Sequence, residues 1–255
     1  MSRVARLRAC AGRSLSVTSA VTPVVSIVIP VCNEEALLRQ TVVELRAEMK
    51  ARGRRYELIL AENGSRDRTS SISHELCHEF DDVRMVTFPR PNYGAALRAG
   101  ILAARGELVI CEEVDLCDAQ FHERALGLLT RMHADLVIGS KLLEGSVDLR
   151  PMARRTASRF YAWLLRGLVG FTGSDTHGLK AFRRTSLLPL VHQCVVDGDV
   201  FASELVVRAY HAGLDVREIP VRIAEKRAPS DNLMKRVPYV LGNLARMTWS
   251  IRAKR

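Results

Sequence analysis

The sequence lacks the cysteine patterns that metal centres and disulfide frameworks require. Its six cysteines are scattered, and no two of them have the C-x-x-C spacing of zinc or redox sites. Disulfides persist mainly in oxidising compartments. We therefore expect no disulfide, no zinc site and a reducing, cytoplasmic location.

Long apolar runs are equally scarce. The longest, at about residues 161–171, is interrupted by Arg166 and is shorter than the roughly 20 residues of a membrane-spanning helix. Residues 1–22 are rich in arginine, serine and alanine, contain no acid, and have no apolar segment typical of a secretory signal. We expect residues 1–22 to form a disordered basic tail, and we expect the chain not to span a membrane by itself.

Acidic residues are few relative to basic ones. The chain has 28 Asp and Glu against 38 Lys and Arg, a net charge of +10, which favours anionic partners such as nucleotide phosphates, anionic lipid or nucleic acid. Nucleic acid is disfavoured because neither a recognition-helix motif nor an aromatic stacking pattern is present. A dinucleotide oxidoreductase is disfavoured because no G-x-G-x-x-G follows the first apolar strand.

The chain does contain a regular alternation of strand and helix patterns. The first half predicts strands at 24–30, 56–61, 83–88, 108–111 and 135–138, with helices at 34–52, 67–80, 93–104 and 121–132. Asn33 is expected to cap the first helix. This succession predicts an α/β fold with a mainly parallel sheet and helices on both faces. The second half, with a long helix at 150–169, shows no repeat and reads as an elaboration of the same domain.

The fourth predicted strand ends in carboxylates. Glu112, Glu113 and Asp115 directly follow the apolar run that ends at Cys111. A buried ionised carboxylate is costly unless a cation or hydrogen bonds compensate it, so the cluster suggests a divalent metal site with oxygen ligands. The alternative is that Glu112 and Glu113 begin a solvated loop.

Four polar segments follow predicted parallel strands. They are the ends of 25–34, 60–69, 91–96 and 113–115. In a parallel sheet they converge on one edge, where open α/β folds bind ligands. That edge would suit a nucleotide, with carboxylates accepting from its base or ribose and a metal bridging its diphosphate.

The same segments carry a family resemblance. They read V-S-I-V-I-P-V-C-N-E, E-N-G-S-R-D-R-T, N-Y-G-A-A-L-R-A and E-V-D-L. In this the chain resembles the family-2 glycosyltransferases of GT-A fold (Rossmann-like), particularly the polyprenyl-phosphate sugar synthases. Later matches include Ile138–Lys141, Ser174–Arg184, Asp199–Leu205 and Glu218–Val221. The resemblance implies a GT-A domain over residues 23–230. After it, apolar residues at helical spacing and the absence of acids predict a basic amphipathic helix at 231–255.

The resemblance also implies roles for individual residues. The nucleotide-sugar would be bound by Pro30, Cys32, Glu34, Leu60, Glu62, Val114, Lys141 and Arg227. Mg²⁺ or Mn²⁺ would be held by Glu113 and Asp115, and Lys141 and Arg227 would contact phosphate or acceptor. The catalytic residues would be Asp115, Asp199 and Glu204, with a carboxylate acting as base only if the acceptor is a hydroxyl.

The implied function is metal-assisted transfer of a sugar, with inversion, from a nucleotide-diphosphate sugar. The expected acceptor is polyprenyl phosphate or another glycan acceptor, in cell-envelope glycan biosynthesis at the inner, cytoplasmic face of the membrane. The chain departs from the family pattern at E-V-D, at E-N-G-S and at Leu233, where a lysine is expected. A non-catalytic protein that binds a nucleotide-sugar or a partner protein is therefore the alternative.

Several residues keep two interpretations. Glu204 could instead be an exposed helix residue paired with Arg208, and His177, beside Asp175, could be catalytic or structural. His122 is expected to be solvated. The basic C-terminal helix could lie on an anionic membrane surface or pack on the domain, because helical periodicity serves both.

Overall fold

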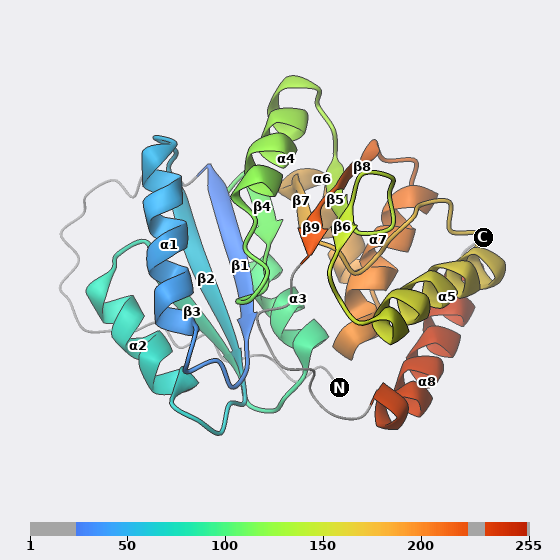
Figure 1. The fold of residues 1–255 in the computed structure, drawn as a ribbon, viewed down its shortest axis with the longest axis horizontal. Helices are drawn as coiled ribbons and strands as arrows, with labels where there is room; N and C mark the ends of the chain where they lie inside the picture. The colour runs from blue at the N-terminus through green and yellow to red at the C-terminus, as the bar shows by residue number, and fades with distance from the viewer. Residues whose placement is uncertain (1–23, 224–232, 254–255) are drawn as a thin grey trace. The chain divides into compact units, whose positions relative to one another are not determined.

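The computed structural model describes residues 24–223 and 233–253, which form two compact units that meet in the sequence at Cys117 and Asp118 (Figure 1). The predicted tail at 1–22 and the candidate Arg227 lie outside the described residues. Within the described segments, none of the five cysteines forms a disulfide. No helix in these segments has the length and apolar content that crossing a bilayer needs.

The first unit is a four-stranded parallel sheet with three helices. Its elements are β1 (Val25–Val31), α1 (Leu38–Ala51), β2 (Tyr56–Asn63), α2 (Thr69–Glu79), β3 (Val83–Phe88), α3 (Tyr93–Ala103) and β4 (Leu108–Cys111). The strand order is β3-β2-β1-β4, and every residue of β1 is buried. Strands buried on both faces are typical of parallel sheets covered by helices. The predicted α/β architecture is confirmed.

The order of the strands creates a crevice between β1 and β4. The chain moves from β1 outward to β2 and β3 and then returns to the other side of β1 with β4. Because such crossovers are right-handed, α1 and α2 cover one face of the sheet and α3 the other. The reversal beside β1 is a topological switch point, and ligands of open α/β sheets bind there at the carboxyl ends of the strands.

The second unit has a smaller sheet and more helix. It comprises α4 (Ala119–Arg131), β5 (Leu136–Ser140), β6 (Val147–Asp148), α5 (Met152–Val169), β7 (Lys180–Arg183), α6 (Arg184–Gln193), the 3₁₀ turn η1 (Gly198–Val200), α7 (Phe201–His211), β8 (Val216–Pro220), β9 (Arg222–Ile223) and α8 (Leu233–Arg252). Strand β5 pairs in parallel with β8 and antiparallel with β7, and β6 pairs with β9. Four phenylalanines fill its core, namely Phe121, Phe171, Phe182 and Phe201.

Two local predictions were wrong. Helix α1 begins at Leu38, and Asn33 takes a left-handed conformation with φ of 58° in the loop before it. Asparagine adopts that conformation more readily than most residues, and here its Oδ1 accepts from the Arg66 amide at 2.8 Å. His122 is fully buried rather than solvated, because α4 turns this position inward beside Phe121, whose ring centroid lies 6.3 Å from that of His122.

Helix α8 occupies the position of the predicted basic C-terminal helix. It packs on its own unit through Leu244, Met247 and Ile251, which are nearly fully buried. The Arg252 Nε donates to the Leu168 carbonyl at 3.1 Å. Packing on the domain is therefore observed, whereas the role of this helix at a membrane stays a prediction.

Candidate functional site

The predicted site residues of the first unit lie at one edge of its sheet. Strands β1 and β2 run parallel with Val31 opposite Glu62, and β1 and β4 run parallel with Val28 opposite Cys111. The segments that carry Glu34, Glu62 and Asp115 therefore all leave the sheet at its carboxyl edge. The sequence predicted this convergence, and it is the geometric condition for one shared ligand site.

The side chain of Asn63 joins three neighbouring strand ends at this edge. Its Nδ2 donates to the Val31 carbonyl at 3.1 Å, and its Oδ1 accepts from the Asn92 amide at 3.1 Å. Asn63 is 4% exposed, so both bonds are shielded from water. Next to it Gly64 has φ of 72°, and a Cβ there would lie 2.9 Å from the Pro91 side chain. The E-N-G-S segment thus sets the spacing of these loops.

The loops after β1 and β2 are bonded to each other. The Glu34 amide donates to Thr69 Oγ1 at 2.6 Å, and the Glu35 amide donates to Asp67 Oδ2 at 3.2 Å. In return the Arg68 amide donates to Glu35 Oε2 at 3.0 Å. Burial alone would raise the pKa of Asp67. Hydrogen bonds from Thr69 and from the Glu35 amide stabilise its ionised carboxylate and outweigh burial, so the pKa is lowered. These bonds hold the loop of Glu34 in place before any ligand arrives.

The carboxylate of Glu62 is also held in place. Its Oε1 accepts from the Ser65 amide at 2.7 Å, and the residue is 3% exposed. Glu34 is similarly buried at 6% exposed. Leu60 lies two positions before Glu62 on the same strand, hence on the same side of the sheet.

The further candidates of this unit are Pro30, which is buried in β1, and Cys32, which is half-buried just after it. Their contact with a nucleoside stays a prediction.

The predicted metal ligands lie in the loop after β4. Glu113 and Asp115 are half-buried, and Glu112 before them is 1% exposed, so the solvated-loop alternative fails for Glu112. Tyr93 Oη lies 3.3 Å from Glu113 Oε1 and donates to it. The carbonyl of Val114 accepts from Thr41 Oγ1 at 3.0 Å. The loop is therefore fixed by α1 on one side and by α3 on the other.

The donor set suits a hard divalent cation. Among the described residues no three His, Cys, Asp or Glu side chains form a metal-binding group. The predicted ligands are the two carboxylates of Glu113 and Asp115. Mg²⁺ is commonly bound by one or two carboxylates, with waters and substrate phosphates as its other ligands. The chemistry of the two residues therefore fits the predicted Mg²⁺ or Mn²⁺.

In the second unit, Lys141 forms a buried ion pair. Its Nζ lies 2.7 Å from Asp175 Oδ2, and the two side chains are 6% and 4% exposed. Burial alone would raise the pKa of Asp175, but the charge and hydrogen bond of Lys141 outweigh it and lower the pKa to about 2. His177 donates its backbone amide to Asp175 Oδ1 at 2.9 Å. The ring of His177 also packs edge-on against Tyr161, with centroids 4.9 Å apart, a contact that fits its structural interpretation.

This ion pair predicts a pH dependence of stability. The pKa of Asp175 is about 2 in the folded state and about 3.9 in an unfolded chain. A lowered carboxyl pKa stabilises the fold above pH 4, and the contribution of about 2 kcal/mol disappears as the pH falls through 2. In urea unfolding, the stability difference between wild type and Asp175→Asn should therefore shrink between pH 4 and 2.

A matched control is the exposed pair of Asp215 with Arg217, 2.7 Å apart with side chains 38% and 53% exposed. Surface ion pairs contribute about 1 kcal/mol or less, so Asp215→Asn should change stability little at any pH. A stability difference for Asp175→Asn that stays constant down to pH 2 would contradict the assigned pairing.

Glu204 is buried and bonded at both oxygens. It is fully shielded from solvent. Its Oε1 accepts from Arg208 at 2.6 Å, while Oε2 accepts from the amides of Val195 and Val196, both at 2.9 Å. The pairing with Arg208 that the sequence suggested is present, but it is buried and not exposed. Asp199 lies in η1 and is half-buried, and the catalytic roles of Asp199 and Glu204 stay predictions.

Three residues at this edge of the sheet were not among the site residues that the sequence predicted. They are Asn63, which joins the strand ends, Thr69, which receives the Glu34 amide, and Tyr93, which donates to Glu113. Asn63 and Thr69 lie in the E-N-G-S-R-D-R-T segment and Tyr93 follows Asn92. These motifs predicted loops at these positions. The hydrogen-bond partners could not be predicted, because they depend on which strands are neighbours in the sheet.

Comparison with known proteins now decides the family. The profile of glycosyl transferase family 2 matches residues 26–188. The chain belongs to glycosyl transferase family 2. It is 30% identical over 234 residues to Glycosyltransferase AglD of Haloferax volcanii, covering 89% of this chain and 37% of that protein. It is 26% identical over 208 residues to Dolichyl-phosphate beta-glucosyltransferase ALG5A of Trichomonas vaginalis, covering 77% and 64%. It therefore spans less than two thirds of either relative.

The fold of this family 2 chain is also that of a solved enzyme. Glucosyl-3-phosphoglycerate synthase of Mycobacterium tuberculosis, crystallised with Mn²⁺, UDP-glucose and phosphoglyceric acid, superposes with a TM-score of 0.67 at 23% identity. The match covers 89% of this chain and 80% of that chain. At this identity the likeness establishes the GT-A fold.

Proposed function

We propose that the chain transfers a sugar from a nucleotide-diphosphate sugar, with Mg²⁺ or Mn²⁺, to a polyprenyl phosphate acceptor. The observation that carries the proposal is the convergence of Glu34, Glu62 and the Glu113–Asp115 loop at the switch-point edge of one parallel sheet. Family 2 membership supports the reaction type. The Mn²⁺ and UDP-glucose of the solved structural relative support the donor class.

Each group of the edge has a defined task in this proposal. The buried carboxylates of Glu34 and Glu62 would accept hydrogen bonds from the base or the ribose of the nucleotide. Glu113 and Asp115 would hold the cation, which as a Lewis acid stabilises the negative charge on the departing diphosphate. The bonds of Asn63 and Thr69 keep these loops in position, so that little ordering is needed when the donor binds.

The acceptor is proposed from its chemistry and from the names of relatives. One relative is a dolichyl-phosphate glucosyltransferase and another an undecaprenyl-phosphate 4-deoxy-4-formamido-L-arabinose transferase. A lipid phosphate is already anionic and needs no strong base to attack the sugar. This agrees with Glu204, whose two oxygens both accept hydrogen bonds from protein groups. Inversion at the sugar, a cytoplasmic location and an anionic membrane surface as partner belong to the same proposal.

A thermal-shift screen tests the donor and the metal together. UDP-, GDP- and other nucleotide-sugars are each added with and without Mn²⁺. A ligand that binds only the folded state stabilises it, by about 3 kcal/mol when the ligand concentration is a hundred times the dissociation constant. The melting temperature rises as a result. We expect one donor to raise the melting temperature strongly only in the presence of Mn²⁺. No shift with any donor would overturn the proposal.

Turnover separates the enzyme from its non-catalytic alternative. The donor found in the screen is incubated with polyprenyl phosphate in detergent, and glycolipid and released nucleotide diphosphate are both measured. Formation of both in equal amounts supports transfer. Donor binding without either product would show a nucleotide-sugar-binding protein, the alternative that the E-V-D and Leu233 departures raise.

A further inference from the structure

Helix α5 exposes an apolar and aromatic stripe. Met152, Phe160 and Trp163 are 70%, 59% and 63% exposed, and their spacing places them along one face of the helix. The rings of Phe160 and Trp163 stack with centroids 5.7 Å apart. Exposed aromatic surface of this kind is typical of an interaction site.

The charges on this helix are all positive. Helix α5 contains no acidic residue, and Arg159 and Arg166 are exposed beside the aromatic stripe. Within residues 24–223 and 233–253, neither arginine pairs with a carboxylate. Arg166 donates once, to the Gly173 carbonyl at 3.3 Å, and a guanidinium has five N–H donors. Most of its donors therefore remain for an external anion.

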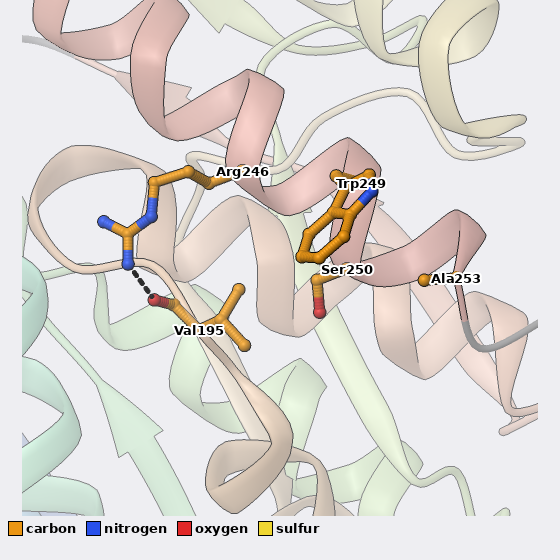
Figure 2. Close-up of a pocket in the computed structure, with 5 residues that line it drawn as sticks. All are labelled: Val195, Arg246, Trp249, Ser250 and Ala253. Carbon is orange, nitrogen blue, oxygen red and sulfur yellow. Dashed lines mark hydrogen bonds between the residues drawn. The ribbon is translucent and has the colours of Figure 1, made fainter.

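Helix α8 continues the same chemistry. The Arg252–Leu168 hydrogen bond brings the C-terminal turns of α5 and α8 together (Figure 1). Trp249, one turn before Arg252, is 77% exposed. Figure 2 shows Arg246 and Trp249 projecting from successive turns of α8 beside Val195, whose carbonyl accepts from Arg246 at 3.2 Å. These residues line a hollow of about 380 Å³ together with Ser250 and Ala253.

We propose that this aromatic–arginine face docks on an anionic lipid bilayer. The proposed surface comprises Arg159, Phe160, Trp163 and Arg166 of α5 and, on the adjacent helix α8, Arg246 and Trp249. Amphipathic helices that lie in the membrane interface combine aromatic residues with basic ones in this way, and basic residues are attracted to anionic headgroups. The inference rests on the proposed function, because a lipid-phosphate acceptor is available only at a membrane.

The charge pattern favours a bilayer over a second copy of the chain. An interface between two copies of this face would place arginines against arginines, and like charges opposed across an interface are costly. Anionic headgroups neutralise each arginine, while the rings of Phe160, Trp163 and Trp249 enter the boundary between headgroups and acyl chains. Of these possible partners, a lipid surface alone satisfies both the rings and the charges.

Vesicle flotation of the full chain tests the surface. The probes are vesicles of phosphatidylcholine alone and of phosphatidylcholine with phosphatidylglycerol in equal amounts. We expect flotation only with the anionic vesicles and weaker binding as salt increases. Each basic residue near the surface is worth about fivefold in binding, so Arg159→Gln with Arg166→Gln should reduce the partition coefficient about thirtyfold. Phe160→Ser with Trp163→Ser should reduce it by at least about tenfold.

A matched control replaces an exposed arginine and an exposed apolar residue at the end of another helix. Arg131 and Met132, at the end of α4, are an exposed arginine and an exposed apolar residue, the latter 61% exposed. The pair Arg131→Gln with Met132→Ser should leave flotation unchanged. All variants alter surface side chains, so their melting temperatures and their donor-induced thermal shifts without lipid should match the wild type.

The outcomes separate the surface from the reaction. Equal flotation of wild type and the α5 variants, or equal binding to neutral vesicles, overturns the docking surface while the donor shift still supports the proposed function. A wild-type dimer that Phe160→Ser with Trp163→Ser converts to monomer also overturns it, since the face would then join two copies. Flotation that follows the predictions without any donor shift supports the surface and contradicts the proposed function.

Discussion

Replacing Asp115 by asparagine is expected to reduce sugar transfer by about a thousandfold or more, because a cation that stabilises the departing diphosphate contributes several kcal/mol. Asp115 lies in the half-buried loop after β4, beside the proposed second ligand Glu113. The amide keeps the shape of the side chain and removes its charge, so the cation loses a ligand while the fold is preserved. The measurement is kcat at saturating donor and Mn²⁺, together with the melting temperature.

Asp118 supplies a matched control three residues later. Its Oδ1 accepts from the amides of Gln120 and Phe121 as the N-cap of α4, at 2.9 and 3.0 Å. Asparagine caps a helix about as well as aspartate, so Asp118→Asn should change neither stability nor turnover. Near-wild-type turnover of Asp115→Asn would contradict the metal role. A loss of turnover accompanied by a lower melting temperature in Asp115→Asn would instead indicate damage to the loop.

The sequence predicted most of the first unit because its signals are local. Buried parallel strands are continuous apolar runs, and the polar residues that end them must leave the sheet at one edge. Thus Glu34, Glu62 and Asp115 could be placed together without coordinates, and the β1–β2 and β1–β4 registers confirm that shared edge. Their exact partners could not be predicted, since the bond from Glu34 to Thr69 spans 35 positions in the chain.

The errors share a physical cause. Asparagine is a residue type that often caps helices. The Asn33 amide, however, donates to Ser65 Oγ, and its Oδ1 accepts from the Arg66 amide, so these tertiary bonds override the local preference for capping. His122 lies on an amphipathic helix pattern that does not reveal whether a neighbouring element covers it. The sequence around Glu204 likewise does not indicate that the amides of Val195 and Val196 donate to its carboxylate.

Disrupting the buried pair of Glu204 and Arg208 is expected to cost about 3–5 kcal/mol of stability, because a charge is left without its partner in a dry environment. Glu204→Gln cannot accept at every site that the carboxylate fills, so its amide group faces either Arg208 or the two backbone amides. Arg208→Met should be comparably destabilising. The two changes together should cost about 1–3 kcal/mol less than their sum, as expected for directly coupled residues.

Urea unfolding and turnover, measured on the same variants, separate this structural role from a catalytic one. The exposed pair of Arg39 with Glu79, 2.6 Å apart with side chains 45% and 47% exposed, is the control, and Glu79→Gln should cost about 1 kcal/mol or less. If Glu204 stabilises the fold, Glu204→Gln and Arg208→Met lose stability alike and keep turnover in proportion to their folded fraction. Full stability of Glu204→Gln with lost turnover would contradict this and assign Glu204 as the base. The acceptor would then have to be a hydroxyl, since a phosphate already carries the charge that a base would create.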